Sequence, residues 1–407
     1  MQEKFGLIGK TLKHSYSKII HSYLADYSYD LVELKKEQLE EFIKNGEYKA
    51  FNVTIPYKKE VMQYLDCVDD LAKEIGAVNT VVKKDGKIYG YNTDFFGMNY
   101  ALERAGISLK GKKVMILGSG GTSDTARAVA KNGGASEIVI VSRTGQVNYQ
   151  NYLTHADTEV IINTTPVGMF PDNFSKPLSL DGFTRLSGVL DVIYNPNLTA
   201  LTFETKQKGI KYSNGLPMLV AQAKKASEYF TCSTIADQRI EEILNELCKN
   251  TLNIVLIGMP GSGKTTLARE LSKILDREVL DTDELIVERL GVDIPTVFEQ
   301  KGEQYFRQVE SEILKEVGIK TGKIISTGGG VVKNPENLFP LKSNGVIFYV
   351  NRAVENLSRD GRPLSKDLES VKKLYQERKD AYENFADYKI DNNKDISLSV
   401  KAIMEKL

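Results

Sequence analysis

The chain has 407 residues, of which 41% are hydrophobic and 27% charged, and this composition is typical of soluble globular proteins. That length exceeds one ordinary core and predicts two or three domains. Fifty-four basic side chains balance 54 acidic ones, so no net charge favours a nucleic acid or an anionic membrane as partner. We therefore expect small-molecule substrates held by local charge.

Cysteine and histidine usage points to a reducing compartment. Cys67, Cys232 and Cys248 stand far apart without C-x-x-C spacing, which argues against a disulfide framework. The histidines share no metal-ligand spacing with them, so we expect no structural zinc site. The N-terminus lacks the apolar core of a signal peptide, and no run reaches membrane-spanning length. These features predict a cytoplasmic protein and leave its oligomeric state open.

The first hundred residues contain four strand-like runs, which are "KFGLIG", "AFNVTIP", "GAVNTVV" and "KIYGYNTD". We expect them to form one lobe over residues 1–98, completed by residues 216–249. A second lobe over residues 99–215 follows, with its glycine turn at Gly118. A cleft between two such lobes is a common position for a ligand.

The segment "KKVMILGSGGTSDTARAVAKNG" has the pattern of a strand, a glycine turn and a helix. Gly118, Gly120 and Gly121 would let backbone N–H groups approach a pyrophosphate at the helix N-terminus. Ser123 takes the third position of the G-x-G-x-x-G fingerprint, so the match is partial. From these residues alone, a dinucleotide site and an ordinary turn are equally open.

The next strand ends at "SRT", where NAD-binding units commonly place a carboxylate for the ribose. Arg143 stands there instead, and an arginine suits the 2′-phosphate of NADP. The alternative is a surface arginine at the end of a strand.

Several spaced motifs across residues 3–240 together resemble shikimate dehydrogenase: "GLIG", "HSYS", "NVTIPYK", "GAVNT", "GYNTD", "GSGG", "SRT", "NTTPVGM" and "GLPMLVAQA". The resemblance implies NADPH-dependent reduction of 3-dehydroshikimate to shikimate, without a metal. Quinate dehydrogenase is the nearest alternative.

Residue roles follow from matching these motifs. Lys58 and Asp94 match the catalytic pair, although an isolated lysine and aspartate would by default be an exposed salt bridge. The substrate-binding positions fall on Ser15, Ser17, Thr54, Asn79 and Gln222. The NADP-binding positions fall on Gly118, Gly120, Gly121, Arg143 and Thr144.

The chain departs from the family at several points. Lys18 stands where proline is usual, Phe95 where glycine is usual, and Ser142 where asparagine is usual. The segment "GQVNYQNYLTHAD" lacks the second basic residue and the helix often found there. These changes bear on NADP affinity more than on catalysis.

The segment "IADQRIEEILNELCKN" predicts an amphipathic helix that closes the first half, with a short joint near residues 249–251. A further domain is expected over residues 250–407. It opens with "GMPGSGKT", a complete G-x-x-x-x-G-K-[ST] loop between the strand-like "NIVLI" and a helix-like segment. Lys264 would reach the β- and γ-phosphates of ATP, and the Thr265 hydroxyl would hold Mg²⁺. The nucleotide-binding set is Gly258, Gly261, Ser262, Gly263, Lys264, Thr265 and Thr266.

Two aspartates follow in "VLDTDELI". Alternation on an extended segment would send Asp281 and Asp283 to one side, the first toward a metal and the second toward an acceptor hydroxyl. Asp283 could instead cap the helix that follows it.

With "GEQYFRQVE", "ISTGGGVV", "SRDGRPLS" and "LYQERKDAYENFADY", residues 252–405 resemble shikimate kinase. The resemblance implies that Arg307 and Arg378 bind the shikimate carboxylate and that Asp283 holds the ring hydroxyls. It places Gly328, Gly329 and Gly330 against the substrate. Arg362 matches the lid arginine that meets the ATP phosphates, and Arg359 is a candidate second one in a shortened lid.

The sequence therefore predicts an α/β protein with a substrate lobe, a Rossmann-type NADP lobe and a P-loop kinase domain with a parallel sheet. It predicts two successive steps of the shikimate pathway, with NADP(H), ATP and Mg²⁺. Besides quinate dehydrogenase activity in the first half, two alternatives stay open: one half is a non-catalytic shikimate sensor, or the P-loop domain phosphorylates a nucleoside. Retention of both catalytic sets speaks against the first, and the arginines against the second.

Overall fold

The computed structural model describes residues 3–12, 15–357 and 368–407. The chain divides into two compact units, Met1–Tyr194 with Thr199–Glu246, and Asn195–Leu198 with Leu247–Leu407. It passes from the first to the second within α8 (Gln238–Thr251). The predicted helix is present, but the joint expected at residues 249–251 is wrong because the helix continues through them.

The first unit begins with a mixed sheet whose strand order is β2-β1-β3-β5-β6-β4. Alternate residues of β1 pack on opposite faces, Ile8 with α2 and Phe5 with the distant helix α7. Its elements are β1 (Lys4–Gly9), α1 (Ser17–Leu24), β2 (Ser28–Glu33), α2 (Leu39–Asn45), β3 (Tyr48–Val53), β4 (Cys67–Val68), α3 (Asp70–Ile75), β5 (Thr80–Lys84), β6 (Lys87–Tyr91) and α7 (Leu216–Thr231).

A second sheet in this unit is wholly parallel, in the order β11-β10-β9-β7-β8. Val114 and Ile116 of β7 pack against α4 and α5, and Met115 and Leu117 pack on the face that α6 covers. The fully described segment between β8 and β9 holds a 3₁₀ turn and no α-helix, in keeping with the prediction. The elements are α4 (Asp94–Arg104), β7 (Lys113–Leu117), α5 (Gly121–Asn132), β8 (Glu137–Val141), β9 (Val160–Asn163), β10 (Gly188–Asp191), α6 (Ala200–Gln207) and β11 (Lys211–Ser213).

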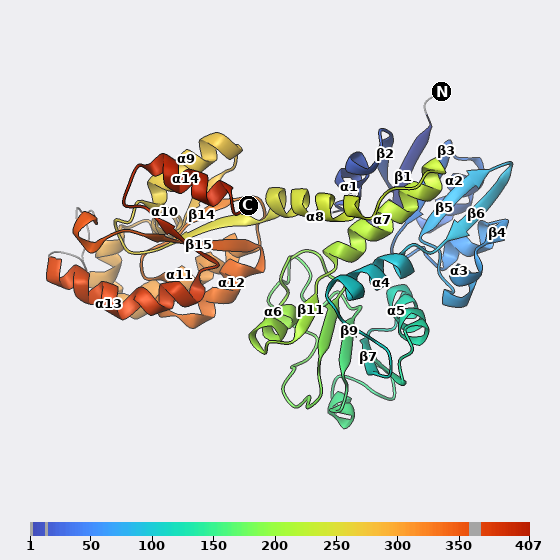
Figure 1. The fold of residues 1–407 in the computed structure, drawn as a ribbon, viewed down its shortest axis with the longest axis horizontal. Coiled ribbons are helices and arrows are strands. Elements are labelled where there is room, and N and C mark those ends of the chain that lie inside the picture. Colours follow the sequence, from blue (N-terminus) through green and yellow to red (C-terminus); the bar gives the residue numbers. More distant parts are fainter. Residues whose placement is uncertain (1–2, 13–14, 358–367) are drawn as a thin grey trace. The chain divides into compact units, whose positions relative to one another are not determined.

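The second unit holds another parallel sheet, in the order β13-β14-β12-β15-β16. Ile254 and Leu256 of β12 pack against α9 and α14, and Val255 and Ile257 pack against α11, α12 and α13, so helices cover both faces (Figure 1). The elements are β12 (Asn253–Ile257), α9 (Lys264–Leu275), β13 (Val279–Asp281), α10 (Thr282–Leu290), α11 (Ile294–Gly318), β14 (Ile324–Ser326), α12 (Leu338–Ser343), β15 (Gly345–Asn351), α13 (Leu368–Phe385), β16 (Tyr388–Asp391) and α14 (Ile396–Met404).

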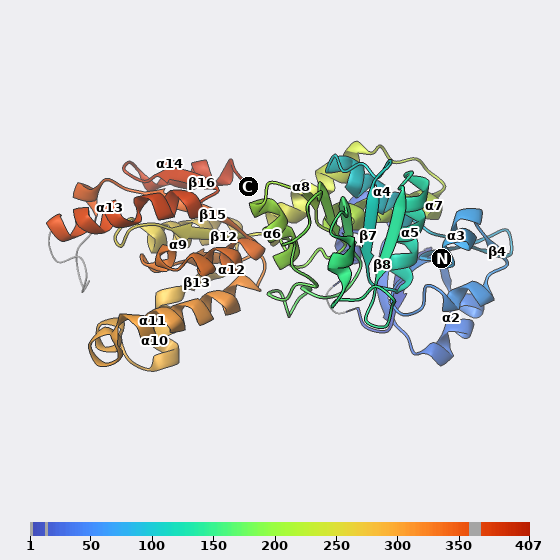
Figure 2. The same ribbon diagram turned by 90° about the horizontal axis from the view of Figure 1, so that it is seen from below.

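The predicted α/β class is confirmed. In both parallel sheets a glycine turn connects an inner strand to its following helix, β7 to α5 and β12 to α9 (Figures 1 and 2). Over the part of the chain that the structure describes, no helix has the length and apolar character needed to cross a bilayer.

Candidate functional site

Lys58 and Asp94 form a tight ion pair in the first unit. The Lys58 Nζ lies 2.5 Å from Asp94 Oδ2, and the two side chains are only 15% and 8% exposed. Asp94 is the first residue of α4, where the helix dipole stabilises a carboxylate. Exposed ion pairs such as Lys73–Asp70 contribute little to stability. The Lys58–Asp94 pair differs because both of its charged groups are largely shielded from water. Burial of two charges in one place suits a reactive site better than a surface salt bridge.

Beside Asp94, Asn79 anchors a buried amide and hydroxyl cluster. Its Nδ2 donates to Thr93 Oγ1 at 3.0 Å and to Gln222 Oε1 at 3.4 Å, and its Oδ1 accepts the Thr93 N–H at 2.7 Å. The cluster joins the start of β5, the start of α4 and helix α7, which are far apart in sequence. Asn79 and Gln222 were predicted, and Thr93 was missed although it lies within the quoted "GYNTD" motif.

The remaining predicted substrate residues lie on other elements. The hydroxyls of Ser15 and Ser17 are 3.0 Å apart at the start of α1, and Thr54 follows β3 with its N–H bonded to Ile8 O. Within the described ranges, no hydrogen bond joins Ser15 or Ser17 to Asn79 or Lys58.

The glycine turn after β7 leaves open space where the sequence predicts a pyrophosphate. Gly118 has φ +111°, and a Cβ there would lie 2.6 Å from Thr164 Oγ1, so only glycine fits. A Cβ built on Gly120 or Gly121 would meet nothing within 4 Å. Ser123, the departure from the fingerprint, donates its hydroxyl to Gly118 O at 2.8 Å and so helps to hold the turn.

Arg143 and Thr144 are exposed just after β8. Strand β8 pairs with β7, and the Gly118 N–H donates to Val141 O, so the glycine turn and "SRT" leave the sheet at the same edge. This common edge is the arrangement that a dinucleotide site requires.

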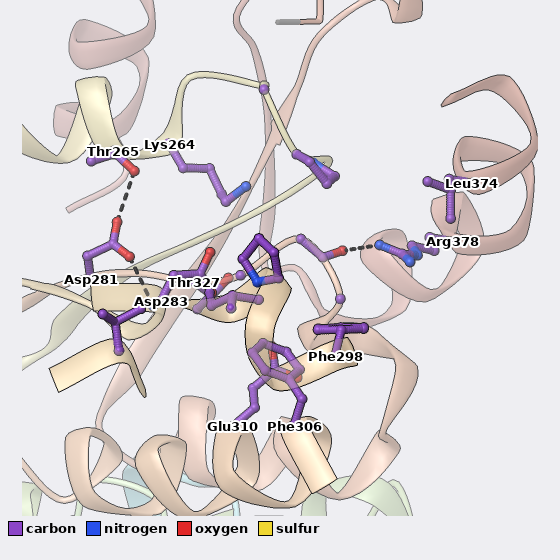
Figure 3. Close-up of a pocket in the computed structure, with 18 of the residues that line it drawn as sticks. Lys264, Thr265, Asp281, Asp283, Phe298, Phe306, Glu310, Thr327, Leu374 and Arg378 are labelled. Carbon is purple, nitrogen blue, oxygen red and sulfur yellow. Dashed lines mark hydrogen bonds between the residues drawn. The ribbon is translucent and has the colours of Figure 1, made fainter. Parts of the chain in front are cut away.

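In the second unit, the glycine loop and the predicted acceptor residues line one pocket of about 640 Å³. Lys264 is buried at the start of α9, and its Nζ donates to the loop carbonyls of Gly258 and Met259 at 2.9 and 3.1 Å. Figure 3 shows Lys264 and Thr265 near Asp281 and Asp283, with Arg378 on the opposite side of the pocket.

Asp281 and Asp283 meet through a helix cap and not through strand alternation. Strand β13 ends at Asp281 and α10 begins at Thr282, so the expectation of one extended segment is wrong. Asp281 is the N-cap of α10, and its Oδ1 accepts the Asp283 N–H at 3.1 Å. The alternative predicted from the sequence, in which Asp283 caps the helix, is therefore wrong. The strand is too short to include both residues, and the cap aims both carboxylates at the pocket.

The chemistry of Thr265 and Asp281 fits Mg²⁺. The Thr265 hydroxyl donates to Asp281 Oδ2 at 2.9 Å, and both are oxygen ligands at the edge of the pocket. Mg²⁺ takes few protein ligands and completes its shell with phosphates and water. Among the described residues, no group of three His, Cys, Asp or Glu side chains is suited to hold a metal ion.

Arg307 lies between two carboxylates of α11. Its Nη1 donates to Glu310 at 2.8 Å, and its Nε and Nη2 donate to Glu303 at 3.2 and 3.1 Å. Burial raises the pKa of Glu310, although the Arg307 charge opposes the shift. Burial lowers the pKa of Arg307, but the two carboxylates outweigh it and raise that pKa. The sequence reasoning gave Glu310 no role, although its i+3 spacing from Arg307 on a helix was a usable signal.

The glycine triplet packs under these charges. A Cβ on Gly328 would lie 2.6 Å from Asp283 Oδ1, and one on Gly330 would overlap the Arg307 guanidinium. Arg378 is 5% exposed and donates to Gly329 O at 2.8 Å, while its Nε is buried without a hydrogen-bond partner in the described structure. The triplet therefore lets two guanidiniums and a carboxylate converge on one space. Arg359 and Arg362 lie outside the described residues.

Comparisons with known proteins match the two ends of the chain to different family models. Residues 7–81 match the family model of the shikimate dehydrogenase substrate binding domain, and residues 260–407 match that of shikimate kinase. The NADP(+) shikimate dehydrogenase of Clostridium perfringens is 38% identical over 264 residues, which are 60% of this chain and 97% of that protein.

Two solved structures are similar to the same part of the chain. A chorismate mutase/shikimate 5-dehydrogenase fusion protein from Clostridium acetobutylicum is 34% identical, with a TM-score of 0.58, and the match covers 61% of this chain and 97% of that one. Shikimate 5-dehydrogenase from Thermus thermophilus, solved with NADP(H) and shikimate, is 28% identical, with a TM-score of 0.54 and coverage of 60% and 99%.

Proposed function

We propose that this chain, which belongs to the shikimate dehydrogenase family and also carries a shikimate kinase domain, catalyses two successive reactions. The first unit reduces 3-dehydroshikimate to shikimate with NADPH. The second transfers the γ-phosphoryl group of ATP to shikimate and gives shikimate 3-phosphate and ADP. The observation that supports the pairing is that one chain holds both the buried Lys58–Asp94 pair and a P-loop pocket lined by Arg307 and Arg378.

In the first reaction, bound NADPH supplies the hydride that reduces the carbonyl carbon. The carbonyl oxygen then needs a proton, and the Lys58 ammonium is the proposed donor. Asp94, 2.5 Å away, keeps that ammonium oriented while the proton leaves. The Asn79 and Gln222 amides can donate and accept hydrogen bonds, which suits a polyhydroxylated substrate. Arg143 is the proposed contact for the 2′-phosphate.

In the second reaction, the bond between the γ-phosphorus and the ADP oxygen breaks as the shikimate hydroxyl oxygen bonds to phosphorus. Asp283 is the proposed acceptor of the hydroxyl proton. Arg307 and Arg378 would hold the substrate carboxylate, because planar guanidiniums match a carboxylate with paired donors. Mg²⁺ bound near Thr265 and Asp281 would neutralise phosphate charge.

Reciprocal lysine variants test the proposal. Lys58→Ala should abolish NADPH oxidation with 3-dehydroshikimate and leave ADP formation with shikimate intact, and Lys264→Ala should do the reverse. Two exposed lysines supply matched controls: Lys59, next to Lys58 in the chain, and Lys273, on the same helix as Lys264. Their side chains are 57% and 69% exposed, and Lys59→Ala and Lys273→Ala should leave both activities intact. Loss of both activities in either active-site variant would contradict two independent sites.

A one-pot assay with 3-dehydroshikimate, NADPH and Mg-ATP tests the order of the two reactions. ADP formation should lag behind NADPH oxidation and require it, because the first product is the second substrate. ADP formation at full rate without NADPH would refute shikimate as the acceptor. Replacing 3-dehydroshikimate with 3-dehydroquinate tests the alternative that the first unit is a quinate dehydrogenase, because only that enzyme would oxidise NADPH faster with 3-dehydroquinate.

A further inference from the structure

Arg352 is a cation in the P-loop pocket to which no motif assigns a role. It is the first residue after β15, and β15 pairs in parallel with β12, whose end leads into the P-loop. Both chain segments therefore leave the sheet at the same edge. Arg352 lines the pocket together with Lys264 and Thr265.

The guanidinium of Arg352 lies against the loop itself. A Cβ built on Gly263 would be 3.8 Å from Arg352 Nη1 and 2.7 Å from Asn392 Nδ2. Asn392 is already committed, because its Nδ2 donates to Ser262 O at 2.7 Å. The guanidinium therefore lies close to Gly263, the P-loop residue that precedes Lys264.

Arg352 lacks the partners that the other pocket arginines have. Its Nε is buried without a hydrogen bond, and among the described residues Arg352 takes part in no ion pair. Arg307, in contrast, pairs with two carboxylates, and Arg378, whose Nε is also buried without a hydrogen bond, donates through Nη1 to Gly329 O. A buried donor without an acceptor is costly in a folded protein and indicates an acceptor that comes from outside the chain.

We propose that Arg352 binds the phosphate chain of the nucleoside triphosphate, as a second cation beside Lys264. The inference rests on the proposed kinase function and adds a residue to it. A phosphate chain carries several negative charges, and the guanidinium offers paired donors of fixed geometry to its oxygens. Lys264, at the end of the P-loop, supplies a single ammonium charge, and Arg352, at the end of the neighbouring strand β15, supplies a guanidinium with paired donors.

A planar guanidinium could instead stack on the purine base. Phosphate binding and base stacking can be distinguished with a ligand that has the phosphates but no base. Inorganic tripolyphosphate carries the charges of the phosphate chain without a base. If Arg352 binds phosphate, its loss weakens tripolyphosphate and ATP alike. If it stacks on the base, only ATP binding weakens.

The test measures binding of ATP and of tripolyphosphate to the full chain by calorimetry. Arg352→Gln should raise both dissociation constants about 10- to 100-fold, the range expected for charge-assisted hydrogen bonds. Arg269→Gln is the matched control on α9, with a side chain that is 67% exposed, and should change neither constant more than about twofold. Arg352→Lys keeps the charge but not the fork and should give an intermediate loss, which covers the case that the glutamine variant folds poorly.

Unchanged binding in Arg352→Gln, or a change equal to that of the control, would overturn the proposal, as would weaker ATP binding with unchanged tripolyphosphate binding. Calorimetry measures nucleotide binding without turnover, so a failure of this inference can be distinguished from a failure of the proposed kinase function. Wild type that binds ATP through Arg352 but phosphorylates no shikimate would refute the kinase assignment alone. Wild type that binds neither probe would refute the inference.

Discussion

Gly330→Ala tests whether the glycine triplet positions Arg307, which is proposed to bind the acceptor. Gly330 has φ −105° and ψ 1°, which alanine adopts without strain. However, the added Cβ would overlap Nη1, Nη2 and Cζ of Arg307, at distances that real Cβ atoms essentially never show. The variant should therefore act by moving one guanidinium, with little direct effect on the backbone.

The size of the effect follows from the contacts of Arg307. The built Cβ lies 2.1 Å from Arg307 Nη2 and 2.4 Å from Cζ, so restoring an ordinary contact of about 3.5 Å requires a shift of roughly 1.1–1.4 Å. Its hydrogen bonds of 2.8 Å to Glu310 and 3.1 Å to Glu303 would then lengthen beyond the hydrogen-bonding range. If the displaced arginine also loses the substrate carboxylate, the cost is about 1.5–3 kcal/mol. We expect kcat/KM for shikimate to fall about 10- to 100-fold, with KM for ATP within about twofold.

A double-mutant cycle with Arg307→Ala identifies the cause. ADP formation is measured at saturating ATP for the wild type, both single variants and the double variant. If Gly330→Ala acts through Arg307, it should cost almost nothing further in the Arg307→Ala background. Additive losses, or an unchanged KM for shikimate in Gly330→Ala, would refute the reasoning.

Three further predictions concern the cofactor, the metal and pH. Gly120→Ala adds a Cβ that meets nothing within 4 Å, so thermal stability should be unchanged while the KM for NADPH rises about tenfold; an unchanged KM would place the pyrophosphate elsewhere. Thr265→Val removes the hydroxyl bonded to Asp281 and should raise the Mg²⁺ concentration needed for half-maximal kinase activity without altering NADPH oxidation, and equal Mg²⁺ titrations would contradict this role. Burial lowers the pKa of His21 from 6.5 to about 3, so its contribution is complete above pH 6.5 and declines as the pH falls toward 3. The free energy of unfolding should therefore drop by about 3 kcal/mol between pH 6.5 and 4. Chemical denaturation followed by near-UV circular dichroism measures this drop, and His21→Phe should largely remove it. The same pH dependence in both proteins would exclude His21 as its source.

Local patterns predicted the two strand, turn and helix segments that are proposed to bind phosphates. A strand, a glycine turn and a helix are encoded within about twenty residues, because apolar runs form the strand and glycine permits the positive φ of the turn. The two glycine segments show this, since β7 is followed by α5 and β12 by α9. The absence of a helix between β8 and β9 was expected from a departure of "GQVNYQNYLTHAD" from the shikimate dehydrogenase pattern, and the structure has only a 3₁₀ turn there.

Local patterns failed where a short element ended earlier than its residues suggested. Asp281 and Asp283 were expected on one strand, but β13 has only three residues and Asp281 caps α10. The joint expected at residues 249–251 shows the opposite error, an element that ends later than expected. Helix α8 continues through Thr251, and β12 begins at Asn253. Element boundaries depend on caps and packing more than on the periodicity of the pattern.

The sequence by itself determined the fold class, the two glycine turns and the residue types that each chemistry needs, because these follow from local periodicity and motif spacing. Only the tertiary structure decided which side chains are neighbours. It brought Lys58 within 2.5 Å of Asp94, laid Arg307 over Gly330, and set Arg352 beside the P-loop with an Nε that has no partner among the described residues. These contacts join elements that are distant along the chain, and they depend on which strands pair and which faces are buried.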